Sequence, residues 1–206
     1  MQALEYRPSE GVSSSPRPIR RAIVLYGSRF GNTERVAMAL ARGLRTIPDV
    51  EVECRSIDLV RASELARYDL LAIGGPTEMF SASAAMKAFL AELPSSLVRG
   101  KRGFAFETRL ASRLSGSAAR YIEKRLVQVG VDLVQPSASA TVRGMTKEER
   151  AAHGDEGAPD WVRKLDKSGR SAPSTTAPRL DLLTPGAEAA FERIGVELGR
   201  AISVPT

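Results

Sequence analysis

The chain has 206 residues, 43% of them apolar, which is enough for one domain with a buried core and additional tails. It contains no apolar run long enough to cross a membrane, and its single cysteine cannot support a disulfide framework, so we expect a cytoplasmic protein. The net charge of +6 implies an acidic partner or an anionic surface, whereas an aromatic content of 5% and the lack of an RNA- or DNA-binding motif argue against nucleic acid.

Residues 1–20 have the composition of a disordered arm. They contain consecutive serines at 13–15, followed by Pro16 and Pro18, and show no hydrophobic periodicity. No apolar segment of the length that a signal peptide needs follows their charged residues. We therefore predict a folded domain over 21–203.

The first folded segment joins a strand to a helix through a short polar loop. Residues 22–27 form an apolar run typical of a buried strand, and a helical pattern follows at once, with one apolar face made by Val36, Leu40, Leu44 and Ile47. The loop at 28–33 reads Ser-Arg-Phe-Gly-Asn-Thr. Because the first N–H groups of a helix lack internal acceptors and carry partial positive charge, this arrangement predicts an anion site, usually for a phosphate.

Two common phosphate motifs do not fit this loop. The Walker motif requires a lysine directly after its second glycine, and Gly31 is followed by Asn32. The dinucleotide fingerprint requires Gly-x-Gly-x-x-Gly, which Gly27 and Gly31 do not supply. The alternative without a ligand is an ordinary turn with an N-cap.

Residues 26–34, Tyr-Gly-Ser-Arg-Phe-Gly-Asn-Thr-Glu, resemble the FMN phosphate loop of the flavodoxin family. Hydroxyl groups and backbone amides bind the phosphate in that family, so no lysine is needed. Phe30 departs from the Ser or Thr that the family more often has, and Arg29 adds a charge that offsets the lost hydroxyl. The resemblance implies that the phosphate is held by Ser28, Arg29, Phe30, Gly31, Asn32 and Thr33.

The segment 50–56 has the pattern of an edge strand. Apolar and charged residues alternate strictly, with Val50, Val52 and Cys54 on one side. We expect the Cys54 thiol to be buried and free rather than a redox partner.

A continuous apolar run at 69–75 predicts a central parallel strand, and Gly75-Pro76-Thr77 follows it. The flavodoxin family has a Gly-x-Pro-Thr turn at this place, as the first loop against the isoalloxazine ring of FMN. The resemblance implies that one side of the ring lies against Gly75, Pro76, Thr77, Met79 and Phe80. A helix follows, with an apolar face at Met86, Phe89, Leu90 and Leu93, and Pro94 stops it.

A further strand at 103–108 ends in Glu107 and Thr108, and a helix opens after Ser115-Gly116-Ser117. This stretch is similar to a bacterial and archaeal branch of flavodoxin-like proteins, in which an acidic residue and Thr-Arg end the strand. The other side of the ring would then lie against Thr108, Arg109 and Leu110. Arg109 either lies near the ring, where it would raise the reduction potential, or pairs with Glu107 as a solvated loop residue.

The remainder is a strand at 131–142, a charged and Gly/Pro/Ser-rich segment at 143–183, and a helix at 185–203 with Thr184 as N-cap and Pro185 first. We read 143–183 as an insertion before the closing helix; the alternative makes 146–166 the closing helix and 170–203 an appended arm. Trp161 is either an anchor for this insertion or a lid over the flavin. His153 is either an exposed loop residue or a proton donor, and one His with one Cys cannot form a metal site.

Alternating strands and amphipathic helices predict an α/β sandwich with a parallel sheet. The resemblance implies the flavodoxin-like form of this fold, a three-layer sandwich with a five-stranded parallel sheet in the order 2-1-3-4-5. Ligands bind beyond the strand C-termini where this order reverses, between strands 1 and 3. The polar loops at 27–33 and 75–81 both lie there, so the fold and the motifs predict the same crevice.

The resemblance implies an FMN-binding electron-transfer protein whose redox partner presents an acidic docking surface. No catalytic triad stands out, which is compatible with redox chemistry because a flavin carries its own reactivity. One alternative is an FMN-dependent oxidoreductase acting on NAD(P)H, quinones or another small acceptor, with 143–183 shaping its pocket. The other is a flavodoxin-like interaction module that no longer binds FMN.

Overall fold

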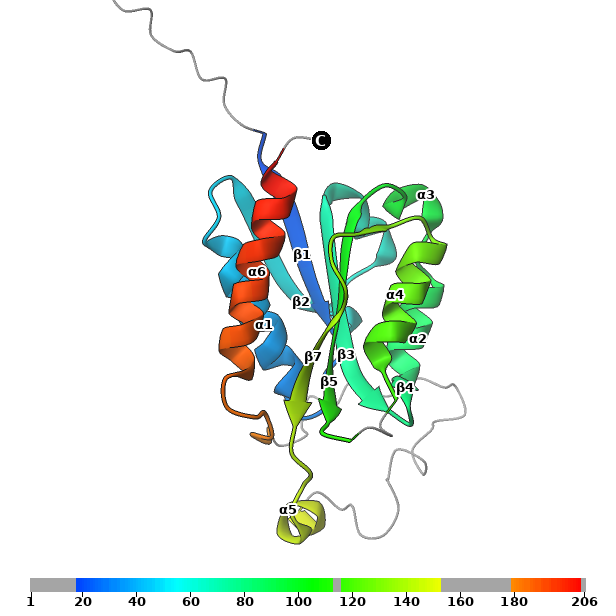
Figure 1. The fold of residues 1–206 in the computed structure, drawn as a ribbon. Coiled ribbons are helices and arrows are strands. Elements are labelled where there is room, and N and C mark those ends of the chain that lie inside the picture. The colour runs from blue at the N-terminus through cyan, green and yellow to red at the C-terminus, as the bar shows by residue number, and fades with distance from the viewer. Residues whose placement is uncertain (1–17, 113–115, 153–178, 205–206) are drawn as a thin grey trace, which may run out of the picture.

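The computed structural model describes residues 18–112, 116–152 and 179–204, and it places a parallel sheet between two layers of helices (Figure 1). The parallel strands are β1 (Arg20–Tyr26), β2 (Val50–Ser56), β3 (Leu70–Glu78), β5 (Arg102–Leu110), β6 (Asp132–Leu133) and β7 (Ala138–Val142). Their order is β2-β1-β3-β5-β6, and β7 pairs with β5 further along the same edge. The predicted order 2-1-3-4-5 is confirmed, because β5 is the fourth parallel strand along the chain and β6 with β7 follows it.

The strand expected at 131–142 is divided into β6 and β7. Pro136 has no N–H to donate to the ladder. The Ser137 amide turns away from the sheet and donates at 2.7 Å to Glu123 Oε1 on helix α4 (Ala118–Gln128). The sheet has seven strands rather than five, since β4 (Ser81–Ala82) also pairs antiparallel with β3.

Helices cover both faces of the sheet. One face carries α1 (Asn32–Arg45) and α6 (Ala187–Ser203), and the other carries α2 (Ala84–Ala91), α3 (Ser95–Val98) and α4 (Figure 1). Two 3-10 segments, η1 (Ile57–Leu59) and η2 (Ala62–Arg67), connect β2 to β3. The short helix α5 (Lys147–Ala152) lies beyond the end of β7 (Figure 1). The expectations for 1–17, for His153 and for Trp161 lie outside the described residues.

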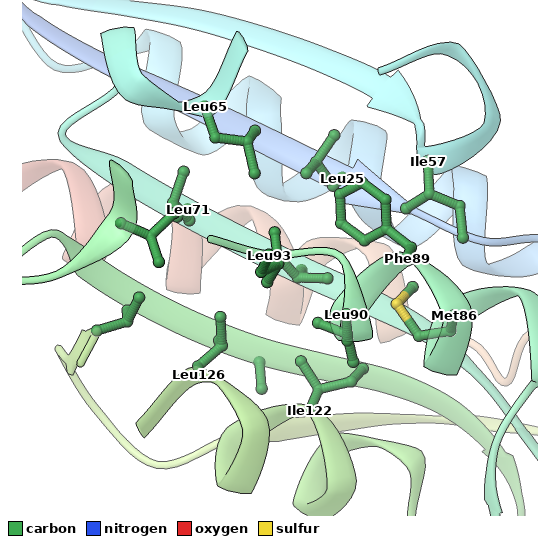
Figure 2. Packing of buried hydrophobic residues seen from close by; sticks show 14 of the residues in the cluster. Leu25, Ile57, Leu65, Leu71, Met86, Phe89, Leu90, Leu93, Ile122 and Leu126 are labelled. Carbon is green, nitrogen blue, oxygen red and sulfur yellow. The ribbon is translucent and has the colours of Figure 1, made fainter. Parts of the chain in front are cut away.

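Each layer of helices packs on the sheet through its own hydrophobic core. On the face of α2 and α4, Leu25 and Leu71 from the strands meet Phe89, Leu90 and Ile122 (Figure 2). On the opposite face, α1 and α6 bury Val36, Leu40, Phe191 and Leu198 against β1, β3 and β5. Truncating a buried leucine of this kind to alanine costs about 2–5 kcal/mol, so these cores fix the sheet edge where the polar loops lie.

Glycine lets α1 and α6 pack in close contact. A Cβ atom on Gly43 would lie 1.9 Å from the Glu192 carbonyl oxygen, and one on Gly195 would lie 2.1 Å from the Leu40 carbonyl oxygen. Neither position therefore accepts a side chain without a shift of the backbone. This contact fixes α1, and with it the loop at its N-terminus.

Two predicted boundaries are wrong. Helix α6 begins at Ala187 behind Gly186, not at Pro185 behind Thr184, because the Thr184 amide is hydrogen-bonded to the Thr141 carbonyl at 3.0 Å beside β7. Strand β3 does not end at Gly75 but runs through Pro76 to Glu78. Its pairing with β1 stops at Gly74, so Pro76 lies where β3 has β5 but no longer β1 beside it, a position that tolerates proline.

No helix in the described part of the chain is both long and apolar enough to span a membrane.

Candidate functional site

The loop at 27–31 leaves β1 and leads directly into α1. Gly31 is the N-cap of α1, in a left-handed conformation with φ of 85°, and no side chain caps the first N–H groups of the helix. The Ser28 Oγ atom is buried and has no hydrogen-bond partner among the described residues. An unsatisfied buried hydroxyl beside an uncapped helix N-terminus fits an anionic group with several acceptor oxygens. The alternative without a ligand, a turn with an ordinary N-cap, is represented by Gly31, which caps the helix without a side chain.

Residues 179–183, which we call the return segment, lie against this loop although they are distant in sequence. The Leu180 amide donates to the Phe30 carbonyl at 3.1 Å, and the Leu182 amide donates to Asn32 Oδ1 at 3.0 Å. Arg179 forms an ion pair with Glu34 at 3.0 Å, and its Cγ would lie 3.4 Å from a Cβ on Gly31. The return segment therefore fixes the position of the loop and of the first turn of α1 through two hydrogen bonds and an ion pair.

Arg29 lies between the loop and the end of β3. Its guanidinium is 5.0 Å from the centre of the Phe30 ring, a cation–π distance. Burial raises the pKa of Glu78, at the end of β3, and the positive charge of Arg29 opposes that rise. Arg29 therefore contributes positive charge to both of the predicted FMN loops.

Met79 and Phe80 form the tip of the hairpin between β3 and β4. Both residues have a positive φ, 43° for Met79 and 64° for Phe80, and residues other than Gly, Asn and Asp rarely adopt this backbone conformation. Their side chains are 63% and 70% exposed, so the strained turn holds two large apolar groups in solvent. Strained non-glycine residues cluster at functional sites, where their cost of about 1–3 kcal/mol each is offset by other contacts. The Phe80 backbone is held against Gly116 and accepts a hydrogen bond from the Ser117 amide at 3.3 Å.

Thr77 does not present a free hydroxyl donor at the sheet edge. Its Oγ1 donates to Glu107 Oε2 at 2.8 Å and accepts from the Ala118 amide at 3.0 Å. The carboxylate of Glu107 is 1% exposed and also accepts hydrogen bonds from Ser117 and Ser139. The Thr77 hydroxyl thus ties β3 to β5 and to the start of α4.

The second predicted ring segment, 108–110, forms the end of β5. Thr108 is buried and shares a 2.7 Å hydrogen bond with Thr33. Arg109 lies 3.7 Å from Glu107 Oε1 and donates to the Ser112 carbonyl at 2.8 Å. The pairing with Glu107 that one of the two alternatives predicted is therefore present, but Arg109 belongs to β5 and is only partly exposed, not a solvated loop residue. The Leu110 side chain is 50% exposed. These contacts connect the second ring segment to the phosphate loop through Thr33.

The structure thus brings the three predicted segments to one edge of the sheet. The Gly27 amide donates to the Gly74 carbonyl at 3.0 Å, and Pro76 is in register with Thr108. Sequence reasoning missed two parts of this edge. It assigned no role to Ser139, and it did not place the return segment beside the loop. Among the described residues, no group of three or more His, Cys, Asp or Glu side chains is arranged to hold a metal ion.

Comparison with known proteins identifies the family to which this chain belongs. The family model for flavodoxin matches residues 24–154. A flavodoxin of Aquifex aeolicus (strain VF5) is 32% identical over 91 residues, 43% of this chain and 49% of the relative. A flavodoxin of Clostridium saccharobutylicum is 32% identical over 95 residues, 46% of this chain and 58% of the relative. The chain thus spans about half the length of the curated relatives it matches.

The fold itself matches a solved flavodoxin from the domain Archaea, with a TM-score of 0.62 and 21% identity over 89% of this chain and 99% of that one. The family match covers more than half of the chain and includes the end of β1, the polar loop, β3 and β5. The chain belongs to the flavodoxin family.

Proposed function

We propose that this chain binds FMN and carries electrons to a protein partner. Membership of the flavodoxin family, whose members bind flavin, supports this function. The observation that carries it is the Ser28 hydroxyl, which is buried without a hydrogen-bond partner among the residues that the structure describes, at the loop that leads into the N-terminus of α1. When bound, FMN supplies the redox chemistry, and the protein binds, orients and tunes it.

We assign the phosphate to the loop and the ring to the two strand ends. Ser28 Oγ, the charge of Arg29, and the first backbone N–H groups of α1 would bind the phosphate, at residues Ser28, Arg29, Phe30, Gly31, Asn32 and Thr33. Asn32 uses its side-chain oxygen for the return segment, so its nitrogen atoms are the donors we propose for the phosphate.

The ring would lie between Gly75, Pro76, Thr77, Met79 and Phe80 on one side and Thr108, Arg109 and Leu110 on the other. Because the Thr77 hydroxyl already donates to Glu107, we assign only the Thr77 backbone to the ring. The exposed side chains of Phe80 and Met79 supply the apolar surface on the first side.

The test compares wild-type protein with S28A and S28T. FMN is added in excess, free flavin is removed by gel filtration, and the retained visible absorption is measured. We expect wild type and S28T to retain flavin, and S28A to bind it about tenfold more weakly, since a hydrogen bond to a charged group contributes about 1.5–3 kcal/mol. Without FMN, S28A should be as stable as wild type or more stable, because it removes a buried hydroxyl that has no partner. Wild-type protein that retains no flavin at micromolar concentration would contradict the proposal.

We further propose that the partner docks through an acidic surface. The net charge is +6, and Arg29 adds positive charge close to the edge that carries the exposed Met79 and Phe80. Electron transfer from the reduced protein to an acidic iron–sulfur protein should slow as salt is added, and transfer to basic cytochrome c should not. The opposite pair of salt dependences would contradict an acidic partner. NADPH oxidation with a quinone, at rates above those of free FMN, would favour the reductase instead.

A further inference from the structure

Glu107 is the most highly connected buried charge at the candidate site. Its carboxylate is 1% exposed and accepts hydrogen bonds from Thr77 Oγ1 at 2.8 Å, Ser117 Oγ at 2.9 Å, the Ala119 amide at 2.9 Å and Ser139 Oγ at 2.7 Å. These donors come from β3, from the start of α4 and from β7, whereas Glu107 lies on β5. One carboxylate therefore joins β3, β5, β7 and the start of α4.

Within the described part of the chain, Arg109 is the cation that pairs with Glu107. Arg109 Nη1 lies 3.7 Å from Glu107 Oε1, and Arg109 is the residue that the proposed function places against the ring. Buried carboxylates persist as anions when several donors and a cation surround them. The N-terminus of α4, whose Ala119 amide faces the carboxylate, adds the favourable end of a helix dipole.

We propose that Glu107 is a positioning residue for the flavin ring. It fixes the separation of the two ring loops through Thr77 and Arg109, and its negative charge cancels the positive charge of Arg109. The inference rests on the proposed function. Its consequence is that the Arg109–Glu107 pair presents no net charge to the ring, so that Arg109 alone does not raise the reduction potential.

The test measures the affinities of the protein for oxidised and for reduced FMN, together with the reduction potential, in wild type, E107Q, R109Q and the double variant. Reduced FMN gains negative charge on its ring, so an unopposed Arg109 favours it. E107Q should raise the ratio of reduced to oxidised affinity about tenfold, the lower end of the effect that one nearby charge has on an ionising group. For a two-electron couple this is a positive shift of about 30 mV. R109Q should lower the ratio by about the same factor, and the double variant should return to near the wild-type ratio.

Several results would overturn the inference. If Glu107 serves the structure alone, E107Q lowers both affinities together and leaves their ratio and the potential unchanged. If E107Q does not fold, R109Q can still overturn the inference, because Arg109 is not part of the buried core: an unchanged ratio in R109Q would mean that the charge of this pair does not act on the ring. Wild-type protein that retains no FMN would overturn the proposed function and this inference with it. If wild type binds FMN but neither E107Q nor R109Q changes the ratio of reduced to oxidised affinity, only the inference is overturned.

Discussion

The Thr33 and Thr108 hydroxyls share a 2.7 Å hydrogen bond in the interior of the protein, joining the first turn of α1 to the end of β5. The two residues are 1% and 4% exposed, and each belongs to a different predicted FMN segment. The bond therefore fixes the phosphate loop relative to the second ring segment.

Because the two hydroxyls bond to each other, removing one should lower the free energy of unfolding more than removing both. T33V leaves the Thr108 hydroxyl buried without this partner, so it should lower the free energy of unfolding by about 1–3 kcal/mol. T33V/T108V removes both hydroxyls and should be closer to wild type than either single variant. Urea denaturation of ligand-free protein measures all three. A double variant whose loss equals the sum of the single losses would contradict the pairing.

Asn32 has two roles in this account, accepting a hydrogen bond from the Leu182 amide and binding the FMN phosphate, and one substitution should separate them. N32D keeps an oxygen for the Leu182 amide, so hydrogen exchange at that amide should stay slow. Its added negative charge should nevertheless weaken FMN binding, because it repels the phosphate. N32A should lose both the slow exchange at the Leu182 amide and the tight binding of FMN, and its free energy of unfolding should fall by about 1–3 kcal/mol. If Leu182 exchanges equally fast in N32D and N32A, the contact between Asn32 and the return segment is not what protects it.

The hairpin tip predicts a substitution that stabilises the protein at the expense of binding. Phe80 has φ of 64°, so F80G removes conformational strain and should raise the free energy of unfolding of ligand-free protein by about 1 kcal/mol. It also removes the apolar side chain proposed for the ring, so FMN affinity should fall. F80L is the matched control: it keeps the strain and should leave stability unchanged. Thermal unfolding that ranks F80L above F80G would contradict strain at this position.

Glu107 and Glu78 predict opposite effects of pH. Burial raises the pKa of Glu107, but the hydrogen bonds from Ala119, Ser139, Thr77 and Ser117 outweigh it, so the pKa lies below its ordinary 4.5. A carboxyl with a lowered pKa stabilises the fold above its unfolded pKa, and this contribution is lost as pH falls through the folded one. E107Q should therefore be less stable than wild type at pH 7, with the difference shrinking below about pH 4.5.

The pKa of Glu78 is shifted the other way. Burial raises it above 4.5, so ionisation of Glu78 costs stability as pH rises. E78Q should accordingly be more stable than wild type at pH 7 and equal to it in acid. Chemical denaturation of both variants between pH 3 and pH 7 measures these differences, and the same sign for both would contradict the assigned environments.

Local patterns were sufficient to predict the central strands and the main helices, and the order of the sheet followed from the resemblance to the flavodoxin family. The apolar runs at 22–27 and 69–75 and the alternation at 50–56 each fix how many faces of a strand are buried. The break between β6 and β7 depends instead on Pro136 and on the bond from Ser137 to Glu123, which lie far apart until the fold brings them together. That break also sets the register that places Ser139 beside Glu107.

The candidate site shows the same division. The motif at 26–34 predicted where the loop lies, but not that the Leu182 amide would bind Asn32 across 150 positions of sequence. The resemblance at the end of the strand proposed Thr108 and Arg109 as ring contacts, but it did not reveal that the Thr77 hydroxyl donates to Glu107. These contacts join residues from separate elements, so they cannot be predicted from the periodicity of side chains within one element.

The most direct test of the account is a calorimetric comparison of FMN with riboflavin, which has the same ring but no phosphate. We predict that wild-type protein binds FMN at least about tenfold more tightly than riboflavin, and that S28A narrows this gap by weakening FMN alone. Equal affinities of wild type for the two flavins would contradict the assignment of the loop at 27–31 and the N-terminus of α1 to a phosphate.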